Sequence, residues 1–499
     1  MGQFKFDVPE EARDFVERSL WKDAYICGIE GVPFQSRNQF DGSQLTISRE
    51  ISNSGKLHMT CPVPGIGNRV LSTCSLRCLP DEPHQLPLEF ARGSCYRARI
   101  QADTWQRAGL TISDQFDDLV ERGTSAFLEA AGLRGDPNRS AIAAIRAITL
   151  LESAINDLGE SYSVQSIAYR KQREPQIGTL MAATVIPPSP IDSPHADAFV
   201  SAFNTAAVRL SWSEIETDSG SFHFDDAEQT IQYFTNQGMR VVGGPLIDFR
   251  TRMMPHWLYL FDEDFESLLK AAVHFVETTV AKFRGKVQLW NCATGLNTPG
   301  PLPLDDEQAM RLAIGILQAV RRTDPNTPAI MSFDQPFGEY LAKDRDGISP
   351  LQFADAMVRS GLGMAGIGLE CRVHYAENAT QPRSPVDFGH MIDRWATLGM
   401  PLLVQLVAPA AIGPDSEATA PTEVLNYLDS SEDPSAQQLR VASAMIRTLL
   451  AKHIVHGIVW DSWSDAEPHV MTHGGLIDQQ GNTRPLLDYL TRVRKEFLT

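Results

Sequence analysis

Four acidic residues follow apolar runs in the second part of the sequence: Asp248, Asp334, Glu370 and Asp461. A pair of carboxylates so placed can perform acid/base or nucleophilic chemistry, because one protonates a leaving group while the other attacks or stabilises positive charge. Glu370 and Asp461 are the pair expected to do so, since both end strongly apolar strands. The structural alternative is that nearby arginines neutralise these carboxylates: Arg250, Arg252 and Arg372.

Two tryptophans and a histidine lie in or just after the same kind of apolar run: Trp460, Trp463 and His374. Aromatic faces can stack on the rings of a ligand, so the tryptophans are candidates for ligand contacts, with interior packing as the alternative. A lone histidine such as His374 is more often structural than catalytic. No His/Asp/Glu cluster shows metal-ligand spacing and no glycine-rich phosphate loop follows a strand, so the sequence predicts neither a metal nor another cofactor.

The elements that must position these residues alternate between strand and helix from about residue 176 onward. Eight apolar runs have strand character: Gly178–Ile186, Ala207–Leu210, Arg240–Leu246, Val287–Trp290, Ala329–Phe333, Ala365–Leu369, Pro401–Val407 and Gly457–Trp460. Helical segments separate most of them: Ala196–Phe203, Ala227–Gln237, Phe265–Phe283, Asp306–Arg322, Pro350–Ser360, Pro385–Leu398 and Ala436–Lys452. This alternation predicts a (β/α)8 TIM barrel over residues 176–499, with its active site at the C-terminal ends of the strands.

The residues before the barrel divide into two parts. Residues 1–101 are rich in strand signals, such as the apolar–polar alternation of Ser43–Glu50, and predict a small β-rich, sandwich-like domain. Such a domain could be a carbohydrate-binding module or an accessory domain packed on the barrel. Residues 102–175 have apolar residues at helical spacing and predict a helical hairpin followed by a linker.

Composition limits the partners. The chain has 499 residues with 44 Lys+Arg and 62 Asp+Glu, a net charge of −18, which disfavours nucleic acid and anionic membranes as partners. The N-terminus lacks the apolar core of a signal peptide, and no apolar run reaches the ~20 residues of a membrane span, so a cytoplasmic location is expected. The odd number of cysteines, seven, favours free thiols. A metal site at Cys74, Cys78 and His84 is the weaker alternative.

Several strings in the barrel region occur in a recognisable order. They include WSEIETDSGSFHFDDAE from Trp212, FRGKVQLWN from Phe283, GIGLE from Gly366, GMPLLVQL from Gly399 and GIVWDSWSD from Gly457. In order and spacing these strings resemble glycoside hydrolase family 10, the xylanase-type barrels, over about residues 176–499. The resemblance implies a retaining glycosidase, whose mechanism needs two carboxylates ~5–5.5 Å apart.

The resemblance fails where that chemistry would occur. The position of the family's general acid/base falls on Gly295, and the position of its nucleophile falls on Gln405. We therefore expect a degenerate glycosidase that binds a saccharide or glycoconjugate. The expected contacts are Asp248, Asp334, Trp460, Trp463 and His374. The alternative is an active, xylanase-like O-glycosyl hydrolase with relocated carboxylates, Glu370 and Asp461.

Overall fold

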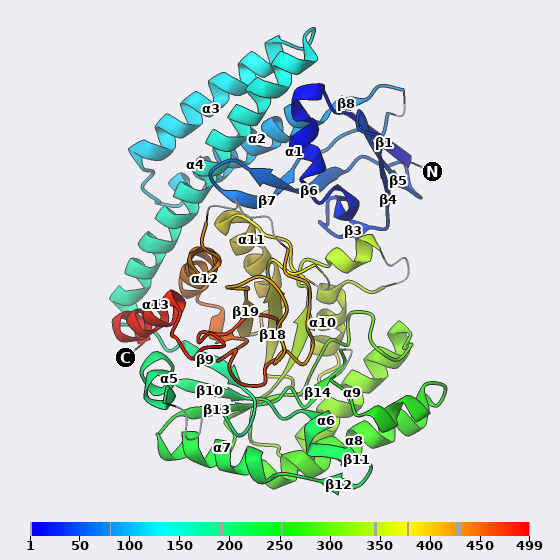
Figure 1. Ribbon diagram of the computed structural model, residues 1–499, viewed down its shortest axis with the longest axis vertical. Helices are drawn as coiled ribbons and strands as arrows, with labels where there is room; N and C mark the ends of the chain where they lie inside the picture. The colour runs from blue at the N-terminus through cyan, green and yellow to red at the C-terminus, as the bar shows by residue number, and fades with distance from the viewer. Residues whose placement is uncertain are drawn as a thin grey trace.

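The computed structural model of the chain places a β-rich and helical N-terminal part against a barrel (Figure 1). It describes residues 2–79, 81–189, 194–250, 253–343, 347–376, 379–425 and 432–498.

Among these residues, eight parallel strands close into a barrel, which confirms the predicted (β/α)8 fold. In barrel order the strands are β9 (Leu180–Val185), β10 (Thr205–Val208), β13 (Arg240–Gly243), β15 (Leu289–Asn291), β17 (Ala329–Asp334), β18 (Gly366–Arg372), β19 (Leu402–Val407) and β20 (Val455–Trp460). Strand β20 pairs with β9 and completes the circle. Each of the eight predicted runs overlaps its strand.

Helices surround the barrel and connect its strands. Their bounds are α5 (Ala196–Ala202), α6 (Trp212–Ile215), α7 (Asp225–Asn236), α8 (Phe265–Phe283), α9 (Asp306–Thr323), α10 (Pro350–Arg359), α11 (Pro385–Ala396), α12 (Pro434–Leu450) and α13 (Pro485–Val493). Several start at side chains that cap their first turn, and α9 has a full capping box between Asp305 and Gln308. All seven predicted helices of the barrel region are present, and the short α6 and the C-terminal α13 are additions.

The β-rich part contains two four-stranded sheets within the described residues. One has the order β4 (Arg37–Phe40), β5 (Gln44–Arg49), β1 (Gly2–Asp7), β8 (His84–Gln85). The other has the order β3 (Pro33–Phe34), β2 (Tyr25–Cys27), β6 (Lys56–Val63), β7 (Gly67–Ser72). Buried side chains of both sheets belong to one apolar cluster. In β1 and β5 every second residue is buried, as the alternation in the sequence predicts.

Helix formation begins earlier than the sequence predicts. The expected hairpin corresponds to α3 (Asp114–Gly132) and α4 (Pro137–Arg173), but a third helix, α2 (Leu86–Arg107), starts within the expected β-rich segment. Gly93 lies inside α2 and weakens the helical signal in the sequence, because glycine disfavours helix interiors. Packing explains its presence: a Cβ there would lie 1.9 Å from the carbonyl oxygen of Ser72, the last residue of β7.

The N-terminal part contacts the α11–α12 side of the barrel. Gly159 of α4 approaches Pro385 so closely that a Cβ would lie 2.7 Å from the proline. Arg97 of α2 binds Asp387 of α11 at 2.5 Å, and Arg383 donates to the Tyr25 hydroxyl at 2.8 Å. Gly159, Pro385 and Arg383 also line the smaller of the two large cavities described below.

Two further expectations concern the whole chain. All seven cysteines lie in described ranges and are free, as predicted, and Cys78 points to the carbonyl of Gln3 rather than joining Cys74 and His84. No helix in the described part of the chain is long and apolar enough to cross a membrane.

Candidate functional site at the barrel mouth

Side chains point into the barrel with the two-residue period of its strands. One inner layer is apolar and consists of Ala182, Ala207, Val242, Ile330, Leu403 and Val459. Two residues further along, the next layer is polar and faces the C-terminal end: Thr184, Arg209, Ser332, Gln405 and Asp461. Glu370 belongs to this second layer, because it pairs in register with Gln405. The predicted carboxylates therefore lie where barrel active sites form.

Two short strands extend the mouth beyond β13 and β15. In β14 (Ile247–Asp248) and β16 (Ala293–Thr294), Asp248 pairs in register with Thr294. The next residue, Gly295, has a φ of 76°. A Cβ on Gly295 would lie 3.1 Å from Arg250 Cγ, so the space beside this position is occupied by the Arg250 side chain.

Arg250 is the centre of an ion-pair network. Its Nε donates to Asp248 Oδ1 at 2.6 Å, and its Nη1 lies 3.5 Å from Glu370 Oε2. Arg209 donates to Asp248 Oδ2 at 2.9 Å. Burial raises the pKa of Asp248, but the charges of Arg250 and Arg209 outweigh it, so this pKa lies below its usual range.

Glu370 and Asp461 are less well compensated. Burial raises the pKa of Glu370 above its usual range; Arg250 opposes this, and the charge of Asp461 adds to it. Burial also raises the pKa of Asp461, against the charges of Arg209 and Arg250. Glu370 accepts a hydrogen bond from Thr294 at 2.7 Å, whereas neither carboxylate oxygen of Asp461 has a partner among the described residues.

The remaining acidic residue, Asp334, is ion-paired with Arg372. Arginines therefore neutralise Asp248 and Asp334, and in part Glu370, as the structural alternative in the sequence analysis proposed. Arg252, the third arginine considered there, lies outside the described residues. Arg209, which completes the network from the end of β10, was not predicted.

The two tryptophans are interior residues. Trp463 is 2 % exposed, and its ring meets those of Phe199 and Phe203 edge to face. Trp460 is 3 % exposed and donates its ring N–H to the carbonyl of Gly474 at 2.8 Å. Neither presents a free face on which a sugar could stack.

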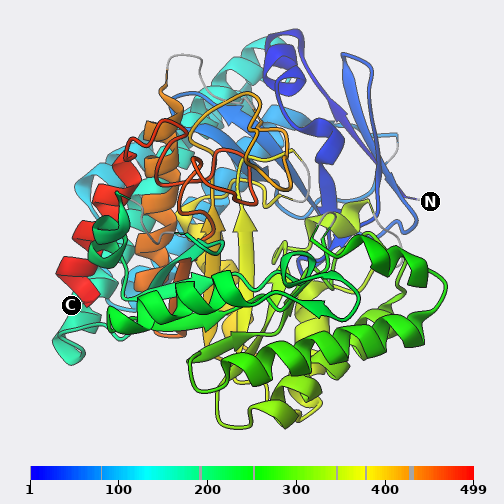
Figure 2. The ribbon, with the colours of Figure 1, turned by 60° about the horizontal axis from the view of Figure 1, so that its bottom comes forward.

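The loops after β19 and β20 lie across the C-terminal end of the barrel (Figure 2). The cavity that Asp461 lines beneath them measures about 10 Å³, room for about one water molecule. Much larger spaces lie between the barrel and the N-terminal part, at about 510 Å³ and 270 Å³. His374 lines both of them.

Backbone strain marks the same region. Three described residues other than glycine have a positive φ: Gln335, His374 and His473. Such conformations cost about 1–3 kcal/mol and are concentrated at functional sites. Gln335 and His374 both line the 510 Å³ cavity. Burial lowers the pKa of His374 to about 4, and the charges of Arg440 and Arg69 add to this.

Part of the chain is similar to known proteins. Residues 169–295 match the model of glycosyl hydrolase family 10. Similar solved structures include native xylanase 10B from Thermotoga maritima, with 15 % identity, 64 % of this chain and 96 % of that chain covered, and a TM-score of 0.49. Xylanase B from Clostridium stercorarium F9 has 15 % identity, coverages of 63 % and 96 %, and a TM-score of 0.48. The barrel assignment itself rests on the strand order of this chain.

Proposed function

We propose that this chain is a family 10-like barrel protein of carbohydrate metabolism that binds a saccharide or glycoconjugate and does not hydrolyse it by double displacement. The family-model match and the motif order support the kinship. In the order of the sequence motifs, Gly295 and Gln405 fall at the positions where family 10 glycosidases have their two catalytic carboxylates. An amide cannot ionise and glycine has no side chain, so neither residue can perform that role.

The barrel mouth supports the loss of hydrolysis. Arg250 occupies the space beside Gly295 and pairs with Asp248 and Glu370. The cavity at Asp461 is far too small for a pyranose ring. A substrate would therefore have to displace both an ion-pair network and the loops above it.

One observation carries the proposed binding site: five buried polar atoms without hydrogen-bond partners among the described residues belong to residues lining the 510 Å³ cavity. They are Ser36 Oγ, Asn38 Oδ1, Glu339 Oε2, His374 Nδ1 and Thr380 Oγ1. Buried polar groups normally have partners, so we infer that a ligand or water in the cavity supplies them after the lining side chains shift to expose these atoms. Sugar hydroxyls both donate and accept, and ligand cavities usually measure about 300–1,000 Å³.

The test measures binding of xylo-oligosaccharides, and of a glycan array, to the full chain. Ser36→Ala and Thr380→Val each remove a hydroxyl, and we expect each to weaken binding about threefold to tenfold, as the loss of one hydrogen bond does. Ser201→Ala, at an exposed serine outside the cavity, is the matched control. Binding that is absent for every glycan, or unchanged in both cavity variants, would refute this site.

A second candidate is hydrolysis by the relocated pair, favoured by the raised pKa values of Glu370 and Asp461. Strand β19 lies between the two strands that carry them, so the strands are roughly 10 Å apart. Turnover of aryl β-xylosides or β-glucosides by the wild type, abolished in Glu370→Gln and Asp461→Asn, would establish this candidate over the first.

A further inference from the structure

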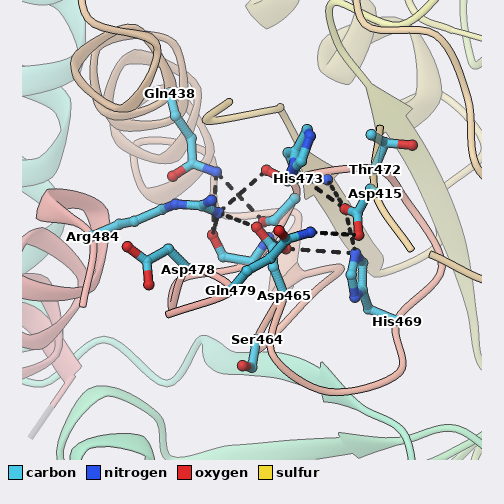
Figure 3. Close-up of polar contacts among 12 residues, drawn as sticks. Asp415, Gln438, Ser464, Asp465, His469, Thr472, His473, Asp478, Gln479 and Arg484 are labelled. Atoms are coloured by element: carbon cyan, nitrogen blue, oxygen red, sulfur yellow. Dashed lines mark hydrogen bonds and ion pairs between the residues drawn. The ribbon is translucent and has the colours of Figure 1, made fainter. Parts of the chain in front are cut away.

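Four metal-ligating side chains meet in the loops that cover the barrel mouth (Figure 3). Asp415 comes from the loop after β19, whereas Asp465, His469 and His473 come from the loop after β20. One ligand atom each from Asp415, Asp465 and His473 lie within 4.8 Å of one another. His469 Nε2 lies 2.9 Å from Asp415 Oδ2 and 3.6 Å from Asp465 Oδ1. All four residues are buried.

The two imidazole rings are oriented by backbone carbonyls. His469 Nδ1 lies 2.9 Å from the carbonyl oxygen of Glu467, and His473 Nε2 lies 3.0 Å from that of Gly413. Because a carbonyl oxygen only accepts, both of these nitrogens carry protons. The other two nitrogens, His469 Nε2 and His473 Nδ1, face the carboxylate of Asp415 at 2.9 Å and 3.4 Å, and a metal ion at Nε2 would replace the hydrogen bond that this nitrogen makes to Asp415. Metal-bound histidines show this arrangement, with the outer N–H donated to a carbonyl or carboxylate.

The charges of the cluster also call for a cation. Asp415 and Asp465 are two buried carboxylates, and Arg484 is the guanidinium that approaches them, 2.6 Å from Asp465 Oδ2. That contact lacks the alignment of a hydrogen bond, so this oxygen has no donor among the described residues. His473 Nδ1 lies 3.4 Å from Asp415 Oδ2 and makes no hydrogen bond to it.

We propose that Asp415, Asp465, His469 and His473 bind one divalent transition-metal ion, with zinc fitting best. Zinc takes four nitrogen or oxygen ligands at about 2.0–2.2 Å in a tetrahedron, which separates neighbouring ligand atoms by about 3.4 Å. Two of the observed separations, 3.4 Å and 3.6 Å, are close to this value, whereas His469 Nε2 lies only 2.9 Å from Asp415 Oδ2, so His469 has to move slightly to become the fourth ligand. The ion offsets the second buried carboxylate and accepts a lone pair from each histidine.

The role of the ion follows from its ligands. A buried site with four protein ligands leaves no open position for a substrate, which is typical of structural zinc. The ligands join the loop after β19 to the loop after β20, so the ion holds the cover of the barrel mouth in place. His473 keeps its left-handed backbone at this junction, where its N–H donates to Asp415 Oδ2 at 2.7 Å. This inference does not depend on saccharide binding.

The experiment uses the full chain, purified without a histidine tag or chelator. Elemental analysis is expected to find one zinc per chain. After chelation, isothermal titration with Zn²⁺ should show one site, and zinc should raise the melting temperature. His473→Gln and Asp415→Asn should weaken zinc binding on the order of 100-fold or more, since loss of even an outer partner costs 10–100-fold. His456→Gln, at an exposed histidine, is the matched control.

A measurement on the wild type covers the case in which the variants do not fold. Co²⁺ added to the chelated protein should give the intense visible absorption of a tetrahedral site, and Zn²⁺ should displace it. The proposal is overturned if the wild type binds none of Zn²⁺, Co²⁺ and Mn²⁺. Zinc binding that is unchanged in both folded variants would equally overturn it, because the ion would then lie elsewhere.

Discussion

Replacing Arg250 tests how the barrel mouth is stabilised. Arg250→Met keeps most of the side-chain volume but removes the guanidinium that binds Asp248 through two nitrogens and lies 3.5 Å from Glu370. Among the described residues, Asp248 would then keep its hydrogen bond from Arg209, and Glu370 its hydrogen bond from the hydroxyl of Thr294. Breaking a buried ion pair from one side costs about 3–5 kcal/mol, because a desolvated charge remains. We expect a loss of that size in the free energy of unfolding.

The assay is urea unfolding at neutral pH, followed by tryptophan fluorescence, with a matched control. Arg311 pairs with Glu266 at 2.6 Å, but their side chains are 45 % and 61 % exposed. Arg311→Met should therefore cost at most about 1 kcal/mol, as exposed pairs do. Adding Glu370→Gln to Arg250→Met should recover part of the loss, since an amide needs no cation. Equal losses in the two single variants would refute the reasoning.

Three further predictions concern stability. Gly295→Ala should lower the melting temperature more than Gly285→Ala does. Both glycines have a positive φ, which costs about 1–2 kcal/mol in other residues, but of these two positions only Gly295 would have a crowded Cβ. Equal losses in the two variants would contradict this. Burial raises the pKa of Asp387, but the charge of Arg97 outweighs it and the pKa falls to about 2. The ionised carboxylate therefore contributes roughly 2 kcal/mol to the free energy of unfolding above pH ~4, and this contribution is lost toward pH 2. Asp387→Asn should remove this pH dependence of stability, and an unchanged dependence in the variant would contradict the prediction. Burial raises the pKa of Asp461, so its charged form opposes folding. Asp461→Asn should therefore raise the melting temperature at pH 8, and should raise it by a smaller amount at pH 4. A lower melting temperature of the variant at pH 8 would contradict this, because the carboxylate would then have a stabilising partner.

The barrel was predictable because its signals are local. Each strand is an apolar run of a few residues, and each intervening helix has its own period and capping residues, so neither needs the rest of the chain to be recognised. Most of helix α2 was not predicted, because the glycine inside it is required by a distant contact. Gly93 packs against the end of β7, and its neighbours in sequence do not show this. The position of the carboxylates at strand ends followed from the barrel once its strands were known.

The partners of those carboxylates did not follow from the sequence. Arg209 completes the network because β10 places it beside Asp248, a contact across 39 residues. Trp463 was a candidate for sugar contact, but Phe199 and Phe203 pack against it.

The proposed metal site depends on contacts that the sequence does not show. The spacing D-x3-H-x3-H, from Asp465 to His473, is visible in the sequence, which nevertheless indicated no metal. The segment forms a loop, where such spacing does not place residues on one face as it does in a helix. Asp415, 50 residues earlier than Asp465, joins them only because two loops meet above the barrel.

The sequence by itself thus determined the barrel, the order of its elements and the acidic residues at the strand ends, because periodicity and turn chemistry act over a few residues. The tertiary structure alone decided which charges are paired, which aromatic rings are covered and where polar atoms remain without partners. Those properties depend on distances between segments far apart in the chain, and burial then sets the energetic weight of each charge.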